Sequence, residues 1–99
     1  MSDTLRVACV QLTSRDDKAA NIEKAERLVA RAAATGADVV LLPEKWNAIG
    51  NADVLHAAAE TLEEGESVAA MAGWAKAHGI ALVGGSIESR DRSLRPWAP

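Results

Sequence analysis

The feature that most constrains the fold is an amphipathic stretch, Lys18–Ala34, that lies between two short apolar runs. Its apolar residues recur at steps of three and four positions: Ile22, Ala25, Leu28, Val29 and Ala32. This spacing predicts a helix with one buried face. The flanking runs, residues 5–12 and 37–42, have the composition of strands that are buried on both faces of a parallel sheet. Together the three segments predict a parallel βαβ unit.

The second half of the chain predicts two more helices, at 52–62 and 68–78, and a third buried strand at 80–87. Ser67 is the expected N-cap of the later helix, and Gly36 and Gly79 are expected to end helices. The fold class is therefore α/β, with the order β-α-β-α-α-β and a mostly parallel sheet. After Glu88 the chain is polar, rich in arginine and contains two prolines. No fourth element is predicted there, and the sheet looks truncated.

Composition excludes several classes of function. The net charge of −3 argues against nucleic-acid binding, and no apolar run approaches the roughly 18 residues of a membrane span. The first residues lack the basic cluster of a signal peptide, and the single cysteine suits a reducing compartment, so we expect a cytoplasmic protein. His56 and His78 lack metal-ligand spacing, and Gly84–Gly85 precedes no helix. We therefore expect no metal or cofactor, and close backbone packing at the glycine pair.

Glu44 is the strongest catalytic candidate. It follows the apolar run at 37–42 and Pro43, and functional groups in open α/β sheets gather at the carboxyl ends of the strands. Pro43 restricts the backbone before it, and a carboxylate at the edge of an apolar core can act as a general base. The alternative is a solvated loop glutamate.

Cys9 lies within the first apolar run, where burial would leave its thiol inert. Cys9 and Arg15 also have the C-x5-R spacing of cysteine phosphatases, but that chemistry needs a loop that wraps a phosphate, and residues 10–14 contain no glycine. For Trp46, packing in the core and a place in a substrate pocket are left as equal alternatives. Glu88 is expected to be a solvated residue at a strand end.

Four stretches in order, VACVQL, the helix containing Asn21, GADVVLLPE and GIALVGGSI, resemble the nitrilase superfamily of carbon–nitrogen hydrolases. PEKWN and VGGSIESR are similar to its omega-amidase branch. The resemblance covers residues 4–90 and leaves 91–99 as a divergent tail, so residues 1–99 are interpreted as one N-terminal portion of such a domain. It implies a partial αββα sandwich that continues beyond this segment, and assembly into homo-oligomers or with a complementing chain.

The resemblance also implies a mechanism with a glutamate, a lysine and a cysteine. The cysteine attacks an amide or nitrile carbon to form a thioester, the glutamate moves the protons, and the lysine stabilises developing charge. Glu44 matches the family glutamate, whereas Lys45 does not occupy the lysine motif, and the family lysine and cysteine lie downstream. We therefore expect a hydrolase fragment that is inactive alone. A non-catalytic remnant or binding module is the alternative, and the cysteine phosphatase is a third.

Overall fold

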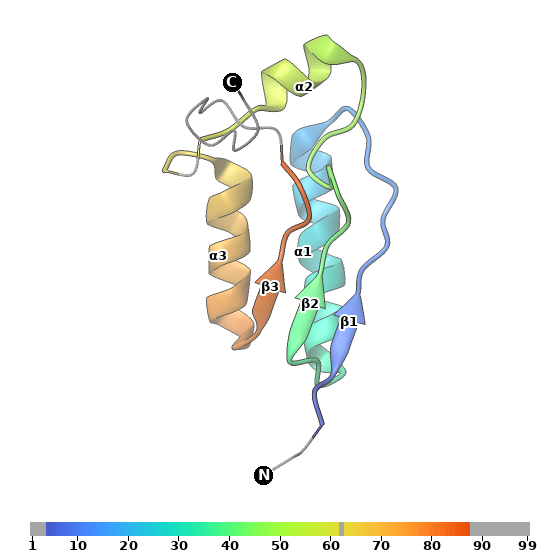
Figure 1. The fold of residues 1–99 in the computed structure, drawn as a ribbon, viewed down its shortest axis with the longest axis vertical. Helices are drawn as coiled ribbons and strands as arrows, with labels where there is room; N and C mark the ends of the chain where they lie inside the picture. Colours follow the sequence, from blue (N-terminus) through green and yellow to red (C-terminus); the bar gives the residue numbers. More distant parts are fainter. Residues whose placement is uncertain (1–3, 62, 88–99) are drawn as a thin grey trace, which may run out of the picture.

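The computed structural model describes residues 4–61 and 63–87 (Figure 1). Its elements confirm the predicted order: β1 (Val7–Cys9), α1 (Lys18–Ala34), β2 (Val39–Leu41), α2 (Ala52–Ala58), α3 (Glu66–His78) and β3 (Ala81–Val83). The three strands are parallel and lie in the order β1-β2-β3, with Val40 of the central strand opposite Ala8 and Leu82. Parallel pairing directs all three strand ends to the same edge of the sheet. Glu88 and the arginine-rich tail lie outside the described residues.

Helix α1 has the bounds that its apolar spacing predicts. The Asp17 side chain caps its first turn by accepting a hydrogen bond from the Ala20 amide, and Gly36 follows the C-cap residue with a positive φ of 90°. Ala25 and Val29 on its apolar face are fully buried against the sheet. Local hydrogen bonds and one apolar stripe therefore account for this helix.

The other two helices differ from their predicted bounds. Helix α2 ends at Ala58, earlier than the predicted limit at 62. Helix α3 begins at Glu66 with Gly65 as its N-cap, so the prediction that Ser67 is the N-cap is wrong. Ser67 lies inside the first turn and is fully buried, and a remote carboxylate, that of Glu60, accepts its backbone N–H instead.

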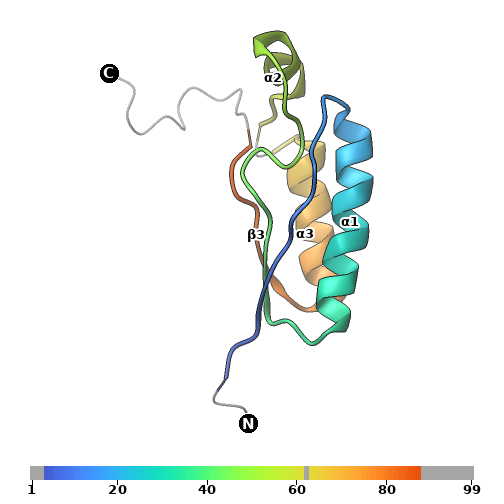
Figure 2. The ribbon, with the colours of Figure 1, turned by 90° about the vertical axis from the view of Figure 1, so that its right-hand side faces the viewer.

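Both long helices pack on the same face of the sheet, as the side view shows (Figure 2). Among the described residues, nothing covers the opposite face, which we call the bare face; it carries Leu5, Val7, Cys9, Val39, Leu41, Ala81 and Val83. Leu5 is 67% exposed and Val83 51% exposed. The prediction of strands buried on both faces is therefore wrong for the described part, because only one layer of helices is present there.

The apolar core lies between the sheet and the two helices. Val40 of β2, Val29 of α1 and Trp74 of α3 belong to one buried cluster, which Leu42 and Trp46 extend past the end of β2. None of the helices in the described residues is long and apolar enough to span a membrane. The core thus holds β2, the strand that leads to Glu44, at its centre.

Gly73 within α3 and Gly79 at its C-cap both have room for a Cβ atom, so substitutions there test backbone conformation without a steric clash. Gly79, the C-cap, has φ of 62°, whereas Gly73 lies within the helix, and a Cβ at either position meets no atom within 4 Å. We expect Gly79→Ala to lower the free energy of unfolding by about 1 kcal/mol and Gly73→Ala to raise it by about 0.5–1 kcal/mol. Urea denaturation of both variants measures this. Equal effects of the two substitutions would contradict the assigned end of α3.

Candidate functional site

Glu44 lies in the turn that follows β2 and Pro43, and its side chain is exposed. Lys45 completes the turn in the left-handed region, with φ of 51°. Within the described part of the chain, no hydrogen bond or ion pair engages the Glu44 carboxylate. The structure therefore places an uncommitted carboxylate at the edge where the three strands end.

The chain after β3 packs directly against this turn. The Lys45 amide donates a hydrogen bond to the Ser86 carbonyl at 2.8 Å. Gly85 has φ of 61°, and a Cβ there would lie 2.7 Å from the Pro43 carbonyl carbon and 2.9 Å from the Glu44 nitrogen. A Cβ at Gly84 would lie 2.7 Å from the Met71 sulfur. The prediction of close backbone packing at the glycine pair is confirmed, and Gly85 is the residue that permits the approach.

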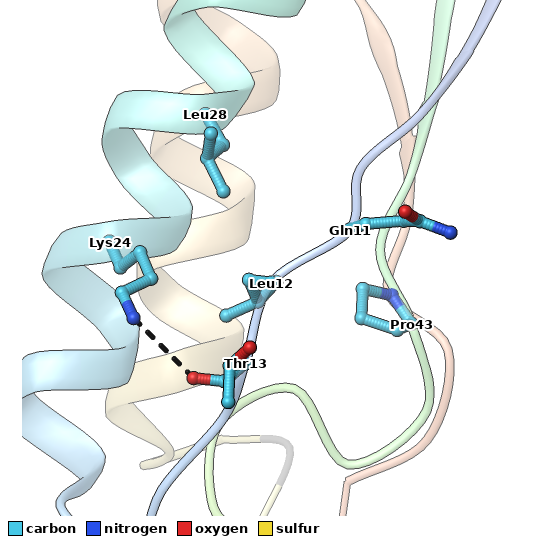
Figure 3. Close-up of a pocket in the computed structure, with 6 residues that line it drawn as sticks. All are labelled: Gln11, Leu12, Thr13, Lys24, Leu28 and Pro43. Atoms are coloured by element: carbon cyan, nitrogen blue, oxygen red, sulfur yellow. Dashed lines mark hydrogen bonds between the residues drawn. The ribbon is translucent and has the colours of Figure 1, made fainter.

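An open groove of about 600 Å³ lies beside the turn, between the end of β1 and helix α1 (Figure 3). Its lining residues are Gln11, Leu12, Thr13, Lys24, Leu28 and Pro43. Leu12 points towards α1, whereas Gln11 points away from it. The Lys24 ammonium donates to the Thr13 carbonyl at 3.4 Å across one end. The groove combines apolar walls with a cation and reaches Pro43, the residue before Glu44.

Trp46, two residues after Glu44, has no exposed surface. Its ring lies 5.8 Å from that of Trp74, at an interplanar angle of 53°. Its indole N–H is buried and has no hydrogen-bond partner among the described residues. Core packing therefore describes Trp46 in this structure, and its place in a substrate pocket stays a prediction.

Glu60 was not predicted as a functional residue from the sequence, yet its carboxylate makes several polar contacts, including one with Asn47 in the loop after Glu44. Its carboxylate is 3% exposed and pairs with the Lys18 ammonium at 2.8 Å. It also accepts the backbone N–H groups of Ser67 at 2.9 Å and Val68 at 3.3 Å, and an N–H of the Asn47 side chain at 3.4 Å. The partners come from α1, α3 and the loop after Glu44, so no local sequence signal could have revealed this cluster.

Burial raises the pKa of the Glu60 carboxyl, because charge is poorly solvated there. The hydrogen bonds from Lys18, Ser67 and Val68 and the charge of Lys18 outweigh that effect, and the pKa lies below the ordinary 4.5. Glu60 is therefore a stabilising anion in the folded chain.

Cys9 is exposed on the bare face, so the prediction that it is buried is wrong. It pairs with Leu41, the last residue of β2, three residues before Glu44. The Val10 amide donates to the Leu41 carbonyl and the Arg15 amide donates to the Asn21 side chain. Both N–H groups are therefore engaged within the fold and are not available to the phosphate-binding loop that a cysteine phosphatase requires. His56 and His78 are both exposed, and no group of three or more potential metal-binding side chains occurs among the described residues.

Comparison with known proteins identifies the family. Residues 6–97 match the carbon–nitrogen hydrolase family model. The chain belongs to the carbon–nitrogen hydrolase family. This confirms the resemblance to the family that the sequence indicated; the role of Glu44 stays a prediction.

Within this family, the chain is similar to omega-amidases. It is 43% identical to the omega-amidase NIT2 of Danio rerio over 86 residues, which is 87% of this chain and 31% of that protein. It is 35% identical to nitrilase homolog 2 of Dictyostelium discoideum over 88 residues, 89% of this chain and 26% of that protein. The chloroplastic omega-amidase of Arabidopsis thaliana is 35% identical over 88 residues, 85% of this chain and 24% of that protein. The chain thus spans at most about a third of the length of these relatives.

Gly85 allows a test of the contact between β3 and the Glu44 turn. Gly85 and Gly79 have nearly equal φ values, 61° and 62°, but only a Cβ at Gly85 meets backbone atoms of Pro43 and Glu44. We expect Gly85→Ala to cost about 1–3 kcal/mol more than Gly79→Ala, because steric displacement adds to the conformational cost. Urea denaturation of the two variants measures the difference. Equal destabilisation by the two substitutions would show that the turn does not depend on close packing of Gly85 against Pro43 and Glu44.

Glu60 predicts an acid-dependent loss of stability. Because the folded-state pKa of Glu60 is lowered, its contribution to the free energy of unfolding is present above pH 4.5. That contribution is lost as the pH falls through the folded-state pKa. We expect Glu60→Gln to lower the free energy of unfolding by about 1–3 kcal/mol at pH 7, and by progressively less below pH 4.5. Lys18→Met should also weaken the dependence of the free energy of unfolding on pH below 4.5, because it removes the cation that pairs with Glu60. Stability curves that run parallel to the wild-type curve in both variants would contradict the assigned network.

Proposed function

We propose that this chain supplies Glu44 as the general base of a carbon–nitrogen hydrolase site that acts on an omega-amide. The observation that carries the proposal is the position of Glu44. It follows the central strand of a parallel sheet, within a segment that matches the family, and its exposed carboxylate has no partner among the described residues. A base must be free to meet its proton donor, and Glu60, which is fully engaged, does not meet that requirement.

In the proposed reaction, a cysteine from a further segment gives its proton to Glu44 and attacks the amide carbon. A tetrahedral species forms, a lysine from the same segment stabilises its charge, and ammonia leaves with a proton from the glutamic acid. The glutamate then takes a proton from water, which cleaves the thioester to the acid and restores the thiol. Neither Lys45 nor Cys9 is assigned these roles, because Lys45 is outside the lysine motif and Cys9 is fixed in β1 opposite Leu41, three residues before Glu44.

The bare face supports the need for a completing segment. Its exposed residues include Leu5, Val7, Cys9 and Val83, without a formal charge among them. A contiguous apolar surface of this kind is typical of a surface that another protein layer covers. We infer that the segment with the lysine and the cysteine packs on this face, as a second sheet layer would. The same face favours a second candidate function, that of a non-catalytic module that binds related chains.

Complementation tests both candidates. The purified chain alone should release no ammonia from an omega-amide. Mixed with the part of the Danio rerio omega-amidase that it does not match, it should form a complex and release ammonia. In the complex, Glu44→Gln should lower kcat by about 100-fold or more, because a general base contributes that much.

Glu26→Gln is the matched control, because Glu26 is an exposed glutamate on α1 and does not line the groove beside Pro43. It should leave turnover within about twofold of the wild type. Full turnover in Glu44→Gln would refute the role of Glu44. A complex without turnover would favour the binding module.

A further inference from the structure

The segment after Glu44 has no regular secondary structure, yet it is tightly bound. Trp46, Asn47 and Ala48 are buried. The Ser14 hydroxyl donates to the Trp46 carbonyl at 2.7 Å, and the Ile49 amide donates to a carbonyl of the loop before α1 at 3.0 Å. These contacts hold the loop in one conformation. The backbone of the turn at Glu44 and Lys45, which leads directly into the loop, is therefore fixed at that end.

Asn47 is the side chain that connects this loop to the rest of the molecule. Its Nδ2 donates to the Ser67 hydroxyl at 3.1 Å and to the Glu60 carboxylate at 3.4 Å. Its backbone carbonyl accepts from the Asn21 side chain at 2.8 Å. The Asn21 side chain also bonds to both backbone groups of Arg15: it accepts from the Arg15 N–H at 2.9 Å and donates to the Arg15 carbonyl at 2.7 Å.

Burial makes these contacts strong constraints. Asn21 is 2% exposed and Asn47 is 3% exposed, so water cannot readily replace a lost partner. The network reaches α1 through Asn21, α3 through Ser67 and the ion pair with Lys18 through Glu60. It contacts the loop three residues after Glu44, and none of its bonds involves the Glu44 side chain.

We propose that Asn47 is a positioning residue: it fixes the loop after Glu44 and thereby the direction in which the Glu44 carboxylate leaves the sheet. Glu60 and Asn21 act through Asn47, by holding its side chain and its carbonyl. The link to catalysis rests on the proposed function. The conformation of the loop does not, and it can be measured in the chain alone.

Amide hydrogen exchange measured by NMR on the 99-residue chain tests the proposal. In Asn47→Ala, exchange at the Lys45 and Ile49 amides should accelerate by roughly tenfold or more, because the loop opens more often. Exchange at the Leu42 amide, which donates to the Val83 carbonyl beside β2, should change by less than about twofold. Should Asn47→Ala fail to fold, Ser67→Ala removes only the hydroxyl partner and should accelerate the same two amides.

Asn51→Ala is the matched control. Asn51 is an exposed asparagine that caps α2 through a bond from the Val54 amide, so its loss should leave exchange at Lys45 unchanged. Unchanged exchange at Lys45 and Ile49 in Asn47→Ala would overturn the proposal. Equal acceleration at Leu42 would also overturn it, because Asn47 would then stabilise the whole fold and not this loop.

The complemented enzyme gives a second measurement. Where the wild-type complex turns over, Asn47→Ala should lower kcat by about tenfold or more with KM nearly unchanged, because a misplaced base slows the chemical step. An unchanged kcat would refute positioning. A wild-type complex without turnover would refute the proposed function, and the exchange measurement would still decide whether Asn47 fixes the loop.

Discussion

The burial of β2 beneath α1 is the contact on which the rest of the structure depends. Val40 in the strand and Val29 in the helix are both fully buried in one apolar cluster. Because β2 is the central strand, its neighbours satisfy its backbone hydrogen-bonding groups on both sides. The end of β2 is therefore held in place, and with it Pro43 and Glu44.

Two other kinds of contact then shape the turn at Glu44. A steric contact, the approach of Gly85 to Pro43 and Glu44, supports it from β3. Beyond the turn, the buried polar network at Asn47 and Glu60 holds the loop. A steric contact resists small displacements, whereas buried hydrogen bonds specify partners, because each unpaired group would be costly. Together they leave the Glu44 carboxylate as an uncommitted group on a supported backbone.

The two faces of the sheet differ in how far their apolar side chains are buried. The face beneath the helices is packed, and its residues contribute burial energy to this chain. The bare face has comparable apolar composition but exposes Leu5, Val7 and Val83. Apolar side chains on a strand have no preferred partner of their own, so the same residue type is buried on one face of the sheet and exposed on the other.

The candidate site was predictable only in part. Glu44 could be selected because its signal is local: an apolar run, a proline and a carboxylate in sequence. Glu60 and Asn47 could not be selected, because their partners are distant in the chain. The sequence separation is 13 residues from Asn47 to Glu60, 20 from Asn47 to Ser67, and 26 from Asn21 to Asn47. Their importance is a property of the folded arrangement.

The sequence by itself determined α1 and the order of the six elements. Caps and apolar periodicity act within four residues, so they are legible before the chain folds. The tertiary structure alone decided that Cys9 is exposed, that Trp46 packs in the core and that Glu60 accepts the first-turn N–H groups of α3, whose N-cap is Gly65 and not Ser67. The physical reason is that burial and long-range hydrogen bonds depend on which remote segments arrive beside a residue, and the residue itself does not specify that.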